Sequence, residues 1–166
     1  MEEATEYKAE VKLRPSSLPM LAACSQFVSG PEKDFTNAGT LRHAGLEHFL
    51  TTDEHHPDLP EEERDKVEWA AEQVRIHMPM SDYPLECERA YSLFHPEDEF
   101  NEIMRGTPDG VCGPMFGFDL KSRRRNYREQ MAAYALAIMQ AKRGTEFRFL
   151  MLFSEERDAE RYEFTA

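Results

Sequence analysis

Three charged residues near the middle of the chain, Asp109, Asp119 and Lys121, have types and spacing that could form a cation site. Strand alternation over residues 114–121 puts Asp119 and Lys121 on one face, away from the neighbouring phenylalanines. A hairpin centred on Pro114 then brings Asp109 directly opposite Asp119. Two facing carboxylates repel each other, so a cation between them is the natural explanation, and all-oxygen ligation favours Mg²⁺ or Mn²⁺.

The chemistry expected of this group is hydrolysis of a phosphodiester. Asp109 and Asp119 would hold the metal ion, which would activate a water molecule and polarise a phosphoryl oxygen. Lys121 would stabilise the charge that develops on the phosphate, or orient the water. Gly117 has no side chain and is expected to leave room beside these groups. The alternative is an ordinary Pro-Asp-Gly turn at Asp109, with Asp119 and Lys121 forming an exposed ion pair on an edge strand.

The elements that must position these residues begin with helices. A short helix is expected within residues 14–24, after a serine cap. A second helix is expected to begin with Thr40 as its N-cap, and it carries His43 and Glu47 one turn apart on one face. Residues 61–78 combine an acidic first turn with apolar residues at helical spacing, which predicts an amphipathic helix.

Strands and a further helix follow. Period-two alternation and apolar runs predict strands over residues 85–93, 103–112, 115–122, 147–153 and 161–164. The further helix is expected over residues 126–143, before the last two strands, with Gly144 as its C-cap. A meander of strands, followed by a helical crossover to a parallel strand, predicts an α/β fold with a central mixed β-sheet flanked by helices.

Size and composition bound the class of protein. The chain has 166 residues, 40% of them hydrophobic, so a single domain over residues 1–166 is expected. No apolar run approaches the roughly 20 residues of a membrane span, and the N-terminus is acidic, which predicts a cytoplasmic protein that does not bind membranes. The net charge of −12 argues against a protein that coats nucleic acid, although the basic block at residues 121–125 leaves room for a locally positive cleft.

Six short segments lie along the chain in a characteristic order. They are residues 17–24, Gly39-Thr-Leu-Arg-His, a strand glutamate at Glu86, Gly106-Thr-Pro-Asp-Gly, Asp119-Leu-Lys and Gln130-Met-Ala-Ala-Tyr. In this order and spacing they resemble the RecB-type branch of the PD-(D/E)XK nuclease superfamily, which includes the nuclease domains of recombination helicase-nucleases, CRISPR-adaptation nucleases and phage exonucleases. The resemblance covers most of the chain and implies the restriction-endonuclease-like core of that superfamily.

The resemblance implies a role for each matched residue at the centre of the site. His43 looks like the additional metal ligand of this branch, and Asp109 matches the acidic residue of its GxxD element. Asp119 and Lys121 match the (D/E)xK pair. For His43, the alternative is a helix histidine that forms a hydrogen bond with Glu47.

Gln130 and Tyr134 match the QxxxY element and are assigned with the catalytic residues. Their spacing puts both on one face of a helix, from which an amide and a phenol can reach the cleft and the DNA backbone. The alternative is a helix face that points into the core. The strand glutamate of the family, a further metal ligand, is assigned to Glu86, although Glu88 lies on the same expected strand face and could equally fill this role.

The basic residues after the catalytic strand, Arg123, Arg124, Arg125 and Arg128, are assigned to phosphate contacts with the substrate. The alternative is charge balance against an acidic surface. The sequence contains no base-reading motif and no stacking platform that spacing alone identifies, so cleavage with little sequence preference is expected.

The cysteines exclude one cofactor of this family. Several relatives bind an iron–sulfur cluster through one cysteine near the N-terminus and three near the C-terminus. Cys24 matches the first position, but no cysteine follows Cys112, so no iron–sulfur cluster is expected. With Cys87 they make an odd number without a CxxC pair, and we expect reduced thiols and no zinc knuckle.

The resemblance and the site together predict a Mg²⁺- or Mn²⁺-dependent deoxyribonuclease. We expect an exonuclease that acts on DNA ends in repair, recombination or phage DNA processing, with DNA as its partner and a recombination or repair protein as a second candidate. One alternative is a non-catalytic domain that keeps the fold and binds DNA or a protein. Another is a phosphohydrolase that acts on nucleotides or RNA.

Overall fold

A computed structural model describes Pro15, Leu18 and residues 37–166, so most of the helix expected within residues 14–24, with Cys24, lies outside the described residues. The described elements in chain order are α2 (Asn37–Thr52), α3 (Glu61–His77), β1 (Leu85–Cys87), β2 (Tyr91–His95), β3 (Asp98–Gly106), β4 (Gly110–Cys112), β5 (Phe116–Lys121), α4 (Arg128–Lys142), β6 (Glu146–Phe153) and β7 (Asp158–Thr165). Among these residues, none of the helices combines the length and the apolar character needed to cross a membrane.

The central sheet is mixed. Its five strands have the order β1-β4-β5-β6-β7, and β2 and β3 form a separate two-stranded sheet. β5 and β6 are parallel and are connected through α4, whereas the other neighbouring pairs are antiparallel. The expected α/β class, with a central mixed sheet reached through a helical crossover, is confirmed.

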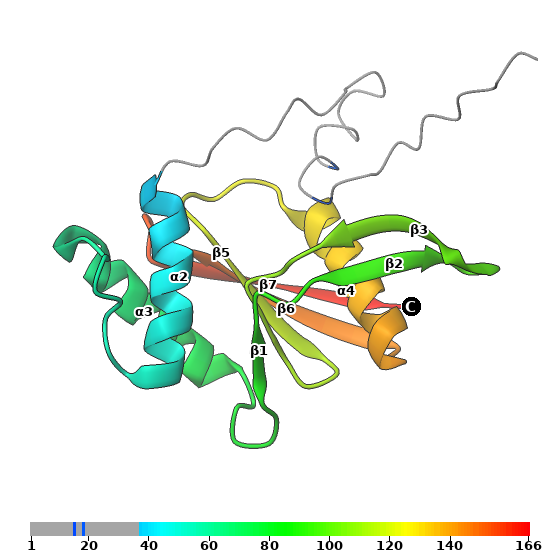
Figure 1. Cartoon of the computed structure of the whole chain (residues 1–166), viewed down its shortest axis with the longest axis horizontal. Helices are drawn as coiled ribbons and strands as arrows, with labels where there is room; N and C mark the ends of the chain where they lie inside the picture. The colour runs from blue at the N-terminus through cyan, green and yellow to red at the C-terminus, as the bar shows by residue number, and fades with distance from the viewer. Residues whose placement is uncertain (1–14, 16–17, 19–36) are drawn as a thin grey trace, which may run out of the picture.

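Helices cover both faces of this sheet (Figure 1). α2 and α3 pack on one face, where Phe118 and Leu120 of β5 belong to the buried cluster. α4 packs on the other face, where Met131 and Ile138 meet Phe149 of β6. Because side chains alternate along a strand, the residues of β5 between these core positions point toward α4.

The amphipathic helix expected over residues 61–78 is confirmed as α3. Its first turn is acidic, which complements the positive end of the helix dipole. Its buried side chains include Val67, Ala70, Ala71 and Val74, at helical spacing.

The hairpin of β4 and β5 has the register predicted from a turn at Pro114. Val111 pairs with Gly117, and the flanking pairs are also symmetric about Pro114. Extending the pairing by one residue beyond β4 brings Asp109 beside Asp119.

Two expected strands are wrong because the chain breaks within them. The strand over residues 85–93 divides into β1 and β2, in different sheets, since Glu88 adopts a left-handed conformation with φ of 50°. The strand over residues 103–112 divides into β3 and β4 around Pro108, which cannot donate a ladder hydrogen bond.

Helix ends also differ from the prediction. α2 begins at Asn37, so Thr40 lies inside the helix and is not its N-cap. At the end of α4, Arg143 adopts the left-handed cap conformation with φ of 55°, in place of the expected Gly144. The backbone N–H of Gly144 instead donates to Met139 O at 2.9 Å.

Candidate functional site

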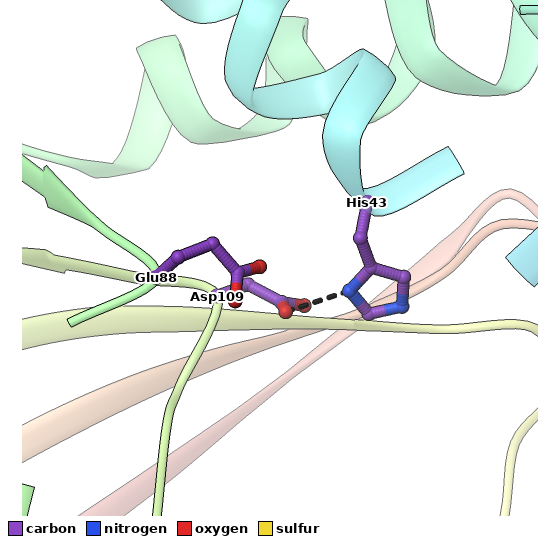
Figure 2. A group of neighbouring side chains, drawn as sticks. All are labelled: His43, Glu88 and Asp109. Atoms are coloured by element: carbon purple, nitrogen blue, oxygen red, sulfur yellow. Dashed lines mark hydrogen bonds and ion pairs between the residues drawn. The ribbon is translucent and has the colours of Figure 1, made fainter. Parts of the chain in front are cut away.

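Asp109 lies between α2 and the end of β5. Its Oδ1 is 2.6 Å from Nδ1 of His43, and its Oδ2 accepts a hydrogen bond of 2.5 Å from the backbone N–H of Leu120. Figure 2 shows the His43 ring reaching from α2 toward this carboxylate. His43 therefore directs Nδ1 to Asp109 rather than to Glu47, which was the alternative for a helix histidine.

Glu88 joins His43 and Asp109 in one group. Ligand atoms of these three residues all lie within 4.8 Å of one another, and Figure 2 shows the two carboxylates side by side. The left-handed backbone at Glu88 ends β1, and the Glu88 N–H donates to Asp109 O at 3.2 Å. The turn at Glu88 therefore brings its side chain to Asp109, which strand alternation from Glu86 did not predict.

Asp119 and Lys121 form an ion pair on the α4 side of β5. Asp119 is 2% exposed, and its Oδ2 lies 2.7 Å from Lys121 Nζ. Asp119 Oδ2 is buried and has no further partner among the described residues, so the Lys121 ammonium is the group that balances it. Lys121 thus balances one carboxylate of the site, and the charge of the neighbouring Asp109 carboxylate is additional to this pair.

The electrostatics of the site follow from an excess of carboxylates. Burial and then the Asp109 carboxylate raise the pKa of Glu88 to about 6. Burial likewise raises the pKa of Asp119, with Asp109 adding to the effect and Lys121 opposing it. Burial alone would lower the pKa of Lys121, but the Asp119 and Asp109 carboxylates outweigh it, so the net shift is upward and the ammonium stays protonated.

These residues fit a divalent cation. The ligand atoms of His43, Glu88 and Asp109 all lie within 4.8 Å of one another, whereas Asp119 is outside this group and pairs with Lys121. Carboxylate oxygens suit Mg²⁺ and Mn²⁺, and an imidazole nitrogen beside them favours Mn²⁺ or another transition metal. Like charges at this spacing favour a bound cation, which would lower their mutual repulsion.

Glu86, the glutamate assigned from the sequence, lies elsewhere. Its carboxylate accepts hydrogen bonds from Tyr91 OH at 2.5 Å and from Lys142 Nζ at 3.0 Å, and it pairs with Arg89. These contacts tie β1 to α4 and to the start of β2. The structure therefore places Glu86 outside the group of His43, Glu88 and Asp109, and the reason is the break in the strand between Glu86 and Glu88.

Gly117 does not leave room for an ion. A Cβ at this position would lie 2.9 Å from Phe149, 3.0 Å from Phe147 and 3.0 Å from Gly110 O, so the phenylalanine rings fill the space. The glycine is needed for the packing of the sheet against α4, and the expectation of an open space beside Asp119 is wrong.

Gln130 and Tyr134 lie on α4 and are both buried, at 4% and 8% exposure. Gln130 Nε2 donates to Tyr134 OH at 3.1 Å, so the amide holds the phenol rather than extending into an open cleft. Tyr134 is close to Asp119, and burial together with that carboxylate raises the pKa of Tyr134 to about 12. Gly106 lies against the same ring, since a Cβ there would meet Tyr134 at 2.3 Å.

The basic residues after β5 divide into two pairs. Arg124 forms ion pairs with Asp158 and with Glu160 of β7, the latter at 2.8 Å. Arg128 lies over the Tyr162 and Phe164 rings at 5.9 and 5.7 Å, also at β7. Arg123 and Arg125 are exposed and form no ion pair with any residue of the described chain. Arg124 and Arg128 therefore already have protein partners, and the ion pairs of Arg124 fit the alternative of charge balance against acidic residues.

Glu47 is a neighbour of the site to which the residue pattern assigned no role. Its charge contributes to the raised pKa values of Glu88 and Cys87, which places it beside the end of β1. The signal was present in the helical spacing of Glu47 from His43, but nothing in the sequence indicated that β1 would end there.

The comparisons with known proteins give little beyond the geometry. No protein-family model matches the chain, and no curated protein matches it. Among solved structures, the chain is similar to an alkaline exonuclease from Laribacter hongkongensis, with 10% sequence identity, coverage of 93% of this chain and 77% of that chain, and a TM-score of 0.43. This likeness is too distant to bear on the function, which has to be inferred from the site itself.

Proposed function

We propose that this protein is a Mg²⁺- or Mn²⁺-dependent nuclease that hydrolyses phosphodiester bonds in DNA. The observation that carries the proposal is the convergence of His43, Glu88 and Asp109 beside the buried pair of Asp119 and Lys121. The order of the sequence motifs supports membership of the RecB-type branch of the PD-(D/E)XK nucleases.

Four side chains would hold the ion: His43, Glu88, Asp109 and Asp119. When bound, the ion supplies an activated water molecule and stabilises negative charge on the phosphoryl oxygen. Asp109 stays oriented because the Leu120 N–H donates to its Oδ2. His43 is held by its contact with Asp109 Oδ1, at 2.6 Å.

Lys121 and Tyr134 would act on the phosphate. The raised pKa of Lys121 keeps its ammonium charged, so it can neutralise the charge that develops on phosphate oxygens. Tyr134 accepts a hydrogen bond from Gln130, which leaves its own O–H free to donate. Gln130 is thus a positioning residue for Tyr134 in this scheme.

Arg123 and Arg125 are the exposed cations best suited to contact the DNA backbone. Phosphate contacts carry no base information, so we infer cleavage with little sequence preference. We also infer that the enzyme acts at DNA ends. Linear and covalently closed circular forms of one plasmid test this inference, since an exonuclease degrades only the linear form.

The proposed activity is tested by incubating labelled DNA with the purified protein in Mg²⁺, in Mn²⁺ or in EDTA. Loss of DNA is expected with either metal and not with EDTA. Asp119→Asn should be inactive, and Glu86→Gln serves as the matched control because Glu86 lies outside the metal group.

The same assay distinguishes the alternatives. Metal-dependent cleavage of RNA or free nucleotides without cleavage of DNA would indicate another phosphohydrolase. Binding of DNA without cleavage in any metal would indicate a non-catalytic domain, and either result would overturn the proposal.

A further inference from the structure

The buried side chain of Arg42 connects the two segments that carry His43 and Lys121. Arg42 immediately precedes His43 on α2, and Ser122 immediately follows Lys121 at the end of β5. We propose that Arg42 is a positioning residue that holds His43 and Lys121 in fixed relation across the site. This inference rests on the proposed function, but its contacts lie outside the metal group.

The guanidinium of Arg42 contacts three separate segments. Arg42 is 5% exposed. Its Nε donates to Glu63 on α3, its Nη1 donates to Ser154 Oγ at 2.7 Å and to Ser122 Oγ at 3.2 Å, and its Nη2 donates to Glu155 at 3.0 Å. α2, α3, the end of β5 and the turn after β6 therefore meet at one side chain.

Ser154 continues the connection to Lys121. Its backbone N–H and its hydroxyl donate to Lys121 O at 2.9 and 3.2 Å, while the hydroxyl accepts from Arg42. The N–H of Glu155 donates to Ser122 O at 3.0 Å. The backbone at Lys121 is thus fixed by the same residues that bind Arg42, and the Lys121 side chain projects from that backbone toward Asp119.

The geometry requires an arginine rather than a positive charge alone. A guanidinium offers five donors in a planar fork, whereas a lysine ammonium offers three donors at one point. α2 packs mainly on α3, and Arg42 and His43 provide polar contacts from α2 to Ser154 after β6 and to Asp109 before β4. Removing one partner of a buried ion pair is strongly destabilising, so a test of this role has to measure metal affinity separately from stability.

The test measures Mn²⁺ affinity by calorimetry, so it does not depend on cleavage. Arg42→Lys should weaken Mn²⁺ binding about 10-fold, as is typical when a residue that orients a ligand is changed. Ser154→Ala removes the hydroxyl that connects Arg42 to Lys121 O but keeps the backbone hydrogen bond to Lys121 O, so it should weaken Mn²⁺ binding less. Val74→Ala is the matched control, because it opens a cavity in the hydrophobic core beside α3 and lowers stability without changing the contacts of Arg42. Its Mn²⁺ affinity should equal that of wild type.

Each outcome decides the proposal. A lower melting temperature for Arg42→Lys with wild-type Mn²⁺ affinity would mean that Arg42 only stabilises the fold. If Arg42→Lys does not fold, unchanged affinity in Ser154→Ala overturns the proposal, and so does a wild-type protein that binds no Mn²⁺. If wild type binds Mn²⁺ and shows the expected shifts but cleaves no DNA, the proposed nuclease activity fails and the role of Arg42 stands.

Discussion

The carboxylates of Glu86 and Glu88, which are separated by one residue, lie in surroundings that shift their pKa values in opposite directions. Burial would raise the pKa of Glu86, but hydrogen bonds from Tyr91 and Lys142 outweigh it and the net shift is downward. Burial and the neighbouring Asp109 raise the pKa of Glu88 to about 6. One carboxylate is neutralised by the protein itself, and the other faces a second carboxylate.

The difference separates structural acids from candidate metal ligands. The Glu86 carboxylate accepts hydrogen bonds from the Tyr91 hydroxyl and the Lys142 ammonium, so its charge is balanced without a metal ion. These contacts join β1 to α4. Glu88, Asp109 and Asp119 are in excess over the cations around them, and the pKa values of Glu88 and Asp119 are raised by burial and by the Asp109 carboxylate. Carboxylates that outnumber the cations around them repel one another, and a bound ion would lower that repulsion.

The largest expected effect is at Asp119. Asp119→Asn should slow DNA cleavage by at least about 1000-fold, because loss of a metal ligand removes several kcal/mol of transition-state stabilisation. Its thermal stability in EDTA should fall, since the variant removes the buried carboxylate that pairs with the Lys121 ammonium. Cleavage of a labelled oligonucleotide measures the rate, and thermal unfolding measures the stability. A wild-type rate would remove Asp119 from the mechanism.

The next effect is at Lys121. Lys121→Met should lower the cleavage rate about 100- to 1000-fold, because the variant has no ammonium to face the developing charge. Mn²⁺ should still bind, since Lys121 is not a ligand and its removal reduces repulsion of the ion. Single-turnover kinetics and calorimetry on the same preparation check this separation. Loss of both properties together would point to a collapsed site.

The comparison of the two glutamates is tested directly by paired variants. Glu88→Gln should raise the half-saturating Mn²⁺ concentration about 10-fold or more while leaving the melting temperature in EDTA near wild type. Glu86→Gln should do the reverse: it weakens contacts with Lys142 and Arg89 and lowers the melting temperature. If Glu86→Gln changes the Mn²⁺ dependence and Glu88→Gln does not, the distinction between the two acids is wrong.

The smallest effect is expected among the arginines. In an Asp119→Asn background that cannot cleave, changing Arg123 and Arg125 to Gln should reduce the salt dependence of DNA binding, by roughly one unit of slope for each phosphate that the variant no longer neutralises. Arg124→Gln should leave the slope unchanged, because Arg124 is already paired with β7. Equal slopes for Asp119→Asn alone and for Asp119→Asn with Arg123 and Arg125 changed would exclude these two arginines as phosphate contacts.

The sequence was most informative where one periodic signal dominated. The apolar stripe of α3 and the hairpin symmetric about Pro114 followed from local spacing, and the second of these brought Asp109 beside Asp119. The α/β class followed from the order of such elements. Each of these inferences needed only contacts that are close along the chain or fixed by strand pairing.

The sequence failed where the backbone departs from a regular element or where distant segments meet. The alternation of apolar and polar residues continues through Glu88, so the residue types did not reveal that the chain turns there. This turn places Glu88 rather than Glu86 beside His43 and Asp109. The partners of Arg42 and Arg124 are far away in the chain, and only the folded structure brings them together. Local patterns carry no information about such contacts.

A crystal soaked in Mn²⁺, with anomalous scattering recorded at the manganese edge, tests the central claim most directly. We predict an anomalous peak bounded by His43, Glu88 and Asp109, within ligand distance of Asp119, and no peak at Glu86. A site without bound manganese at saturating concentration, or manganese bound only at Glu86 or elsewhere on the surface, would contradict it.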